Sequence, residues 1–259
     1  MLLVIDAGNT YIKFGVYDGE QLIARWRLVA APSRTTDEYG VQVCDLFSRA
    51  GIDVERINAV AIACVVLPLN ETLRSMSEHC FHRAPLFVEH TIELGMEILY
   101  DAPQDVGADR IVNAFAALHK YGAPCIVVDF GTATKFEAIN ERRQYLGGVI
   151  APGLGISLDA LFKRAPRLPH VEIKRPQTVI GSSTVAALQS GLYHGYASLV
   201  DGILKKMREE LNEKPRVIAT GGLAHLIADG SSFIEVIDDT LTLEGLRLIH
   251  ERVRAKQTT

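Results

Sequence analysis

The sequence has few cysteines, no long apolar run and no block of like charges, and each absence excludes a class of protein. Its four cysteines are widely spaced and form no C-x-x-C pair, which predicts reduced thiols in a cytosolic protein instead of a disulfide framework. The longest apolar run, residues 59–69, is too short to span a bilayer. The N-terminal residues lack the basic region and cleavage site of a signal peptide. We therefore expect a cytoplasmic protein with no membrane partner.

The charge balance argues against a nucleic-acid-binding protein. The 259 residues carry a net charge of −4 at pH 7, without the basic surface that nucleic-acid binding requires. Apolar residues make up 48% and charged residues 22% of the chain, which is the balance of a globular protein with a buried core. His79, Cys80 and His82 lie close together, but no second ligand pair has a convincing spacing for a metal site. No nucleic-acid partner is therefore expected.

One short pattern occurs twice, in residues 4–10 and again in residues 127–132. Each copy is an apolar strand, then Asp, any residue, Gly, and soon afterwards a hydroxyl residue. Each is followed by two strand-like segments joined by a tight turn. The repeat predicts two similar domains, residues 1–121 and 122–259. No long linker separates them, so we expect a cleft between closely packed halves.

Strands and helices alternate along the chain, which predicts an α/β fold. Besides the two repeated strands, the expected strands are 13–17, 22–28, 59–66, 85–88, 135–139, 145–150, 217–219 and 234–237. The expected helices are 35–50, 109–121, 184–211 and 243–254, with a short helix after residue 223.

The repeated loops have the chemistry of a phosphate site. Gly8 permits a tight turn with outward backbone N–H groups, and Asn9 and Thr10 add side-chain donors. Asp6 at the strand end can hold Mg²⁺, directly or through water. Lys13 can reach a phosphate as a point charge. A simple β-turn explains one such loop equally well, but two facing copies can hold a nucleotide's phosphates from both sides.

A third loop, residues 219–223, places paired glycines after a strand, where the backbone can approach a ligand. An ordinary strand-to-helix turn explains it as well. The three loops in this order resemble the acetate kinase, sugar kinase, heat-shock ATPase and actin superfamily. That resemblance implies two tandem ribonuclease H-like domains, each a mixed five-stranded sheet flanked by helices.

Further motifs narrow the resemblance to type III pantothenate kinase, over nearly the whole chain. They are residues 105–110 (DVGADR), 129–134 (DFGTAT), 147–153 (GGVIAPG), 189–191 (QSG) and 241–246 (LTLEGL). The resemblance implies ATP-dependent phosphorylation of pantothenate to 4'-phosphopantothenate, the first step of coenzyme A biosynthesis. It also implies a homodimer whose substrate pocket is partly built by the partner subunit.

The resemblance implies a role for each matching residue. Asp109 corresponds to the catalytic base, although a carboxylate at a helix N-terminus is also favoured by the helix dipole. Asp129 corresponds to the ligand of a monovalent cation, K⁺ or NH₄⁺. The substrate contacts are Tyr100, Gly107, Ala108, Asp109, Arg110 and Thr184. The expected ATP and phosphate contacts are Asp6, Ala7, Gly8, Asn9, Thr10, Tyr11, Ile12, Lys13 and Thr132.

The chain departs from the family where residues 135–137 read Lys, Phe, Glu in place of a hydroxyl residue, an aromatic and Asp. Lys135 can add a phosphate contact, compete with the monovalent cation, or point to solvent. Two other functions stay open: a kinase for another small hydroxylated substrate, or a non-catalytic nucleotide-binding regulatory homologue. The motif from Gly107 to Arg110 argues against the first, and Asp6, Asp109 and Asp129 argue against the second.

Overall fold

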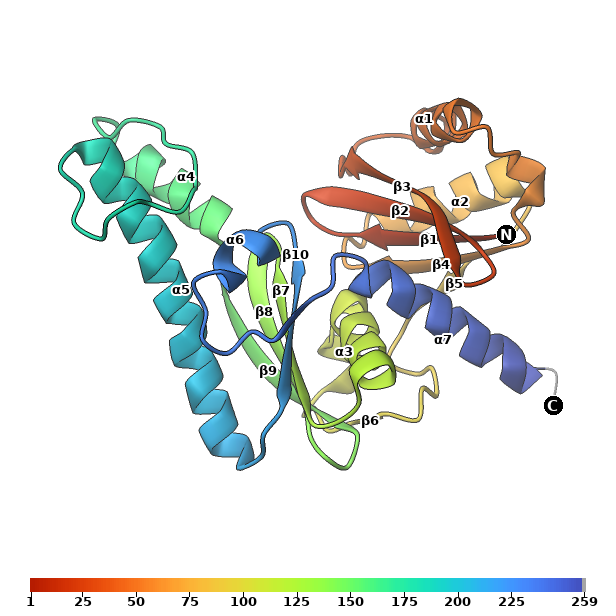
Figure 1. The fold of residues 1–259 in the computed structure, drawn as a ribbon. Helices are drawn as coiled ribbons and strands as arrows, with labels where there is room; N and C mark the ends of the chain where they lie inside the picture. Colours follow the sequence, from red (N-terminus) through yellow and green to blue (C-terminus); the bar gives the residue numbers. More distant parts are fainter. Residues whose placement is uncertain (258–259) are drawn as a thin grey trace. The chain divides into compact units, whose positions relative to one another are not determined.

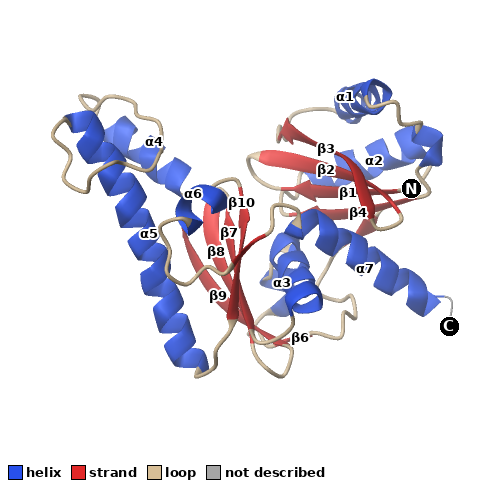
Figure 2. Cartoon of the chain, viewed as in Figure 1, coloured by secondary structure: helices blue, strands red, loops and turns tan. Residues whose placement is uncertain are grey.

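The computed structural model describes residues 1–257, and contacts within the chain divide it into two compact units. The first unit contains Met1–Met96, Tyr100–Ala116 and the C-terminal segment from Leu241, and the second contains Glu97–Leu99 and Ala117–Thr240. Each unit has a β-sheet with helices beside it (Figures 1 and 2). The predicted α/β class is therefore confirmed.

Five strands form the sheet of the first unit, as predicted, and their order is β3-β2-β1-β4-β5. β1 pairs antiparallel with β2 and parallel with β4, so the sheet is mixed. The apolar run of β1 is buried along its whole length, as expected for a central strand, while β3 alternates between exposed and half-buried residues at the edge. The strands are β1 (Leu2–Ala7), β2 (Tyr11–Asp18), β3 (Gln21–Val29), β4 (Ala59–Cys64) and β5 (Leu86–Phe87).

Helices cover both faces of this sheet (Figure 1). α1 (Thr36–Arg49) begins with a capping box between Thr35 and Glu38. Together with α2 (Leu69–Phe81) it packs on one face, where Phe47 and Met76 enter the core. α7 (Leu241–Gln257) packs against β1, β2 and β4. Two 3-10 turns, η1 (Val54–Arg56) and η2 (Pro103–Asp105), complete the unit together with the first residues of α3 (Ala108–Tyr121).

The sheet of the second unit has six strands, in the order β11-β10-β7-β8-β9-β6, so the predicted number of five is wrong. The additional strand β6 comes from a separate part of the chain and pairs with only two residues of β9. The strands are β6 (Glu97–Ile98), β7 (Cys125–Phe130), β8 (Ala133–Ile139), β9 (Gln144–Pro152), β10 (Arg216–Gly221) and β11 (Val236–Ile237). The helices are α4 (Leu154–Arg164), α5 (Thr184–Leu211) and α6 (Ala224–Ala228).

Each unit, as divided by contacts, contains more than one stretch of the chain. α7 belongs by its contacts to the first unit, although the sequence places it in the C-terminal half. The domain ranges 1–121 and 122–259 stay a prediction. Neither α2 nor α4 is among the helices expected from the sequence. Both follow loops without a side-chain cap at the N-terminus, so the usual start signal is missing.

A buried carboxylate links two distant parts of the second unit. Asp238, after β11, accepts hydrogen bonds from Lys120 Nζ at 2.5 Å and from the Tyr121 hydroxyl at 2.8 Å. Burial acts to raise the pKa of Asp238, but the hydrogen bonds from Lys120, Tyr121 and the Thr240 backbone outweigh it and hold the pKa below its ordinary value. The carboxylate is therefore charged at neutral pH.

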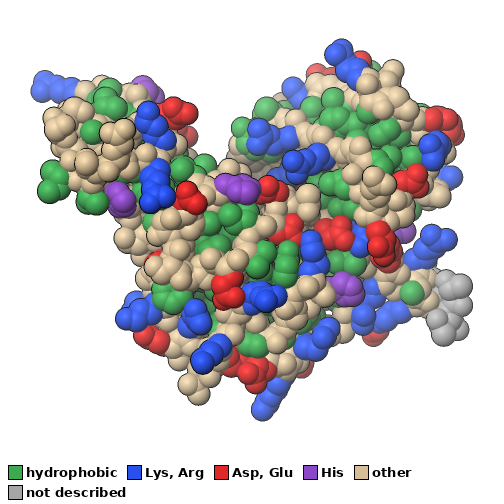
Figure 3. All heavy atoms as spheres, viewed as in Figure 1, with side chains coloured by type: hydrophobic (Ala, Val, Ile, Leu, Met, Phe, Trp, Pro, Cys, Tyr) green, Lys and Arg blue, Asp and Glu red, His purple; other side chains and the backbone are tan. Residues whose placement is uncertain are grey.

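No helix among residues 1–257 combines the length and apolar content needed to cross a bilayer. On the face drawn in Figure 3, Lys and Arg side chains are interspersed with Asp and Glu side chains. That face therefore carries no extended field of one sign.

Candidate functional site

The first repeated loop connects β1 to β2 and is open to ligands through its backbone. The Gly8 N–H donates to the Tyr11 carbonyl at 3.0 Å, which closes the turn, and the Thr10 carbonyl accepts from the Ala30 N–H. Asn9, Thr10 and Tyr11 are exposed. The side chains of Ala7 and Ile12 are instead buried in the core, so these two residues can meet a nucleotide only through their backbone.

Asp6 and Lys13 form an ion pair across the first loop. The antiparallel register of β1 and β2 places the two residues opposite each other. Lys13 Nζ lies 3.1 Å from Asp6 Oδ2, and Asp6 is only 6% exposed. The Lys13 side chain is 41% exposed. The pair therefore combines a buried carboxylate at the strand end with an ammonium group that solvent and ligands can reach.

The second loop repeats this pair in the second unit. β7 and β8 place Asp129 opposite Lys135, and Lys135 Nζ lies 2.9 Å from Asp129 Oδ2. Here both side chains are largely buried, at 15% exposure for Lys135 and 12% for Asp129. The alternative in which Lys135 points to solvent is therefore wrong. The repeat therefore includes a cross-strand lysine in addition to the Asp-x-Gly pattern. The sequence does not show this as a repeat, because the spacing from Asp to Lys differs by one residue between the two copies.

The backbone of the second loop is held by close packing. Thr132 is exposed, while its carbonyl accepts the Gly153 N–H at 3.0 Å. A Cβ atom added to Gly153 would lie 2.2 Å from that carbonyl oxygen, so only glycine fits there. Behind the loop, the hydroxyl groups of Thr134 and Tyr196 are hydrogen-bonded. Tyr196 comes from α5, and no local pattern could have identified it as a residue that supports the loop.

The third loop has a structural reason for its glycines. Gly221 has a φ of +95°, and an added Cβ would lie 2.6 Å from the Phe130 carbonyl oxygen. The same carbonyl accepts the Gly222 N–H at 3.1 Å. The close approach seen here is between β10 and the end of β7, which supports the ordinary packing explanation.

The catalytic candidate Asp109 lies in the first turn of α3, in the first unit. Its Oδ1 accepts the Arg110 N–H at 2.8 Å, which fixes the orientation of the carboxylate. An added Cβ at Gly107 would lie 2.8 Å from this Oδ1 and 3.3 Å from Val65 Cγ1. Because the Val65 N–H donates to the Ala7 carbonyl at 3.1 Å, the turn before α3 lies beside the end of β4 and near the end of β1.

The predicted substrate residues fall into two groups. Arg110 is 6% exposed, and its guanidinium carbon lies 5.6 Å from the centroid of the Tyr100 ring. This cation–π contact is in the first unit, next to Gly107 and Asp109. Thr184 is the exposed first residue of α5, in the second unit. The structure therefore brings the residues from 100 to 110 together within one unit and leaves Thr184 on the other.

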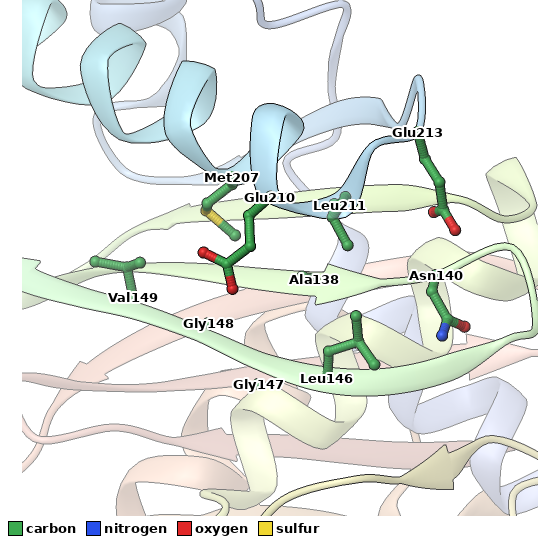
Figure 4. Close-up of a pocket in the computed structure, with 10 residues that line it drawn as sticks. All are labelled: Ala138, Asn140, Leu146, Gly147, Gly148, Val149, Met207, Glu210, Leu211 and Glu213. Atoms are coloured by element: carbon green, nitrogen blue, oxygen red, sulfur yellow. The ribbon is translucent and has the colours of Figure 1, made fainter.

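Two cavities within the units contain none of the predicted site residues. A cavity of 430 Å³ lies in the second unit between the C-terminal end of α5 and the strands β8 and β9 (Figure 4), where Met207 and Glu210 project toward the sheet. A cavity of 720 Å³ lies in the first unit, at the amino ends of β1 and β4. The predicted phosphate loop is at the opposite, carboxyl end of β1. These hollows are therefore separate from the candidate site.

Known proteins resemble this chain in sequence over almost its whole length. The model of the type III pantothenate kinase family matches residues 2–206. Curated proteins named type III pantothenate kinase include one from Geobacter sulfurreducens, 52% identical over 98% of this chain and 100% of its own length. Another, from Koribacter versatilis, is 50% identical over 97% of this chain and 96% of its own length.

Solved structures of lower identity share the fold. A conserved Baf family protein from Campylobacter jejuni superposes with a TM-score of 0.60 at 20% identity, over 98% of this chain and 99% of that one. A polyphosphate/ATP-glucomannokinase from Arthrobacter sp. strain KM superposes with a TM-score of 0.52 at 17% identity, over 98% of both chains. Both likenesses concern the fold, and they agree with the two tandem domains predicted from the loops.

Proposed function

This chain belongs to the type III pantothenate kinase family, and on that premise we propose which of its residues carry out each part of the reaction. The enzyme uses ATP and a divalent metal to phosphorylate pantothenate, in coenzyme A biosynthesis. The full-length likeness to the family is the observation that carries this conclusion. The roles of individual residues rest in addition on the contacts described above.

Asp109 is the proposed general base. In phosphoryl transfer the protein mainly positions the reactants and neutralises charge, while a carboxylate accepts the proton of the attacking hydroxyl. As the pantothenate oxygen bonds to the γ-phosphorus and ADP leaves, the proton passes to the Asp109 carboxylate. The hydrogen bond from the Arg110 N–H supports this role because it holds the carboxylate in one orientation.

Arg110 and Tyr100 are the proposed binding residues for the pantothenate carboxylate. A guanidinium group presents a planar fork that matches a carboxylate. The contact with the Tyr100 ring limits the positions that this fork can take. The backbone at Gly107 and Ala108 completes the pocket, where a larger residue at 107 would collide with Asp109 and Val65.

The two loops are the proposed ATP site. The backbone from Asp6 to Lys13 and the exposed Thr132 bind phosphate oxygens, and the partly exposed Lys13 supplies positive charge. Asp6 fits Mg²⁺, since this ion is commonly held by one or two carboxylates together with phosphates and water. No cluster of three metal-ligating side chains occurs among residues 1–257. When bound, Mg²⁺ neutralises charge on the phosphates.

At Asp129 we propose that Lys135 supplies the charge that the family resemblance assigns to K⁺ or NH₄⁺. A primary ammonium group is chemically close to NH₄⁺, and Lys135 Nζ lies 2.9 Å from the carboxylate oxygen. Both side chains are largely buried, so a mobile ion would have to displace the lysine. In this chain Asp129 would then bind a monovalent cation only when Lys135 is removed.

A homodimer is the proposed assembly, with Thr184 completing the pocket of the partner. Three apolar residues near Thr184 support it: Val179 is 67% exposed, Ile180 is 89% exposed and Val185 is 42% exposed. The segment is held in place because the Ser190 hydroxyl donates to the Val179 carbonyl. Exposed apolar residues that lie together mark surfaces at which proteins associate.

ADP release with Mg²⁺-ATP and pantothenate tests the assignment of the base. We expect Asp109→Asn to lose about 10²–10⁴-fold in kcat, with little change in the KM for ATP. Asp159→Asn, an exposed carboxylate on α4, is the matched control and should keep full activity. An Asp109→Asn variant that turns over at the rate of the unmodified enzyme would remove Asp109 from the mechanism.

A further inference from the structure

Two cysteines that lie far apart in the sequence meet between α1 and α2. Cys44 is on α1 and Cys80 is in the last turn of α2. The Cys44 thiol is near enough to Cys80 to contribute to the raised pKa of the Cys80 thiol, and both residues are half-buried. Neither takes part in the reaction described above. The other two cysteines, Cys64 and Cys125, are on different strands.

A glycine on α1 allows this approach. Gly40 lies one turn before Cys44 on the same side of the helix. A Cβ atom added at Gly40 would lie 3.0 Å from the Cys80 sulfur. The absence of a side chain at Gly40 therefore lets the Cys80 sulfur rest against α1, within reach of Cys44. Because both thiols stand on packed helices, their proximity is a fixed property of the first unit.

The surroundings of Cys80 keep its thiol protonated. Burial, and to a smaller extent the Cys44 thiol and the Asp37 carboxylate, raise the pKa of Cys80 to about 12. At neutral pH Cys80 is therefore almost wholly protonated, and a protonated thiol is a poor nucleophile. Cys80 by itself therefore reacts slowly with an oxidant.

We propose that Cys44 and Cys80 are a dithiol site that closes into an intramolecular disulfide when the protein meets a small-molecule disulfide such as glutathione disulfide. The Cys44 thiolate attacks one sulfur of glutathione disulfide, and one glutathione thiolate leaves. Cys80 then loses its proton and attacks the Cys44 sulfur of the mixed disulfide, and the second glutathione leaves. Two electrons and two protons pass from the protein to the oxidant, which is reduced to two glutathione molecules.

The disulfide would join α1 to α2 and close the chain segment between them. A disulfide that closes a segment of this length removes conformational freedom from the unfolded chain. We therefore expect the oxidised protein to unfold at a higher temperature than the reduced protein. The Cys80 sulfur already rests against α1 at Gly40, one turn from Cys44, and closure brings the two sulfur atoms to a separation of about 2.05 Å.

The test is to incubate the full-length folded protein with glutathione disulfide and count its free thiols after denaturation. We expect two of the four thiols to be lost, and a digest to contain a peptide pair linked through Cys44 and Cys80. Dithiothreitol should restore all four thiols and the lower unfolding temperature. Four free thiols after prolonged incubation, or separate glutathione adducts on both cysteines, would overturn the proposal.

Two variants and the other cysteines provide controls. Cys44→Ser and Cys80→Ser should each form no internal disulfide, while Cys125→Ser should still form the link from Cys44 to Cys80. A disulfide that includes Cys64 or joins two protein molecules would contradict the assignment. A lower unfolding temperature after closure would show that the link distorts the helix pair, which would also refute the geometric argument.

Discussion

Replacing Lys135 with glutamine is expected to make pantothenate phosphorylation depend on K⁺ or NH₄⁺. The substitution keeps a polar side chain of similar length but removes the ammonium group 2.9 Å from the Asp129 carboxylate. The carboxylate remains in a largely buried position, and a mobile monovalent cation can then bind it. If Lys135 fills that role in the unmodified enzyme, as proposed above, its turnover should change little between salts.

The size of the effect follows from the geometry of the pair. Two unit charges at this distance attract by about 6 kcal/mol at an effective dielectric constant of about 20. Desolvation offsets part of this, and removing one partner of a buried pair costs about 3–5 kcal/mol. A cation present at about 100 times its dissociation constant returns about 2.7 kcal/mol. Saturating K⁺ should therefore restore more than half of the lost stability.

Two measurements at constant ionic strength test this reasoning. One is urea-induced unfolding, and the other is ADP release, each in potassium chloride and in tetramethylammonium chloride. The bulky tetramethylammonium ion serves as the cation that cannot enter the site. Lys13→Gln, which breaks the corresponding but more exposed pair with Asp6, is the matched control and should show no K⁺ rescue of stability.

One result would refute the argument directly. If the unmodified enzyme is strongly activated by K⁺ and Lys135→Gln is activated by the same factor, Lys135 does not occupy the cation position. Equal stability of Lys135→Gln in the two salts would also count against it. Lys135→Arg gives a further check, because it retains the charge and should stay insensitive to K⁺.

Three further predictions concern packing, assembly and pH. Gly153→Ala places a Cβ atom against the Thr132 carbonyl, so we expect a loss of about 1–3 kcal/mol in unfolding free energy and a higher KM for ATP, whereas Gly155→Ala meets nothing within 4 Å and should be tolerated. Ile180→Asp puts a charge on an exposed apolar residue and should shift the mass measured by light scattering from dimer to monomer, while activity falls. The pKa of Asp238 is lower in the folded than in the unfolded chain, so its contribution to stability is present above the unfolded value of about 3.9 and is lost as pH falls through the folded pKa. The stability difference between the unmodified protein and Asp238→Asn, from urea unfolding, should therefore shrink below about pH 4.

Each of these has an outcome that would contradict it. Equal unfolding free energies for the two glycine variants would mean that the second loop is not held by its contact at 153. A monomeric unmodified protein with full activity would remove the proposed dimer. A stability difference for Asp238→Asn that grows in acid would reverse the sign of the pKa argument.

The local motifs could be recognised from sequence because their chemistry is contiguous. Asp6, Gly8 and Lys13 belong to one strand-turn-strand segment, whose apolar run and turn residues determine its local shape. Likewise Gly107 and Asp109 lie within one turn at the start of a helix. Five of the eight residues of β2 are buried, and the predicted strand at 13–17 lies within its bounds.

Other features depend on segments that are distant in the sequence. β6 joins the second sheet by pairing two of its residues with β9, and no periodic pattern marks so short a strand. α7 reads as an ordinary terminal helix, and its packing on β1, β2 and β4 depends on the shape of a sheet formed by the other end of the chain. Contacts of this kind arise from long-range packing, which a local pattern does not encode.

The sequence by itself therefore determined the α/β class, the two Asp-x-Gly loops and the family, because hydrophobic periodicity, turn residues and short motifs act over a few neighbouring residues. Only the tertiary structure decided where Lys135 points, since the antiparallel register of β7 and β8 places it against Asp129. It also brought the Cys80 sulfur against α1 beside Gly40, one turn from Cys44, through the packing of two helices from different parts of the chain. In both cases the outcome depends on which distant segments pack against each other after folding. That packing determines which buried charged groups and thiols lie next to one another.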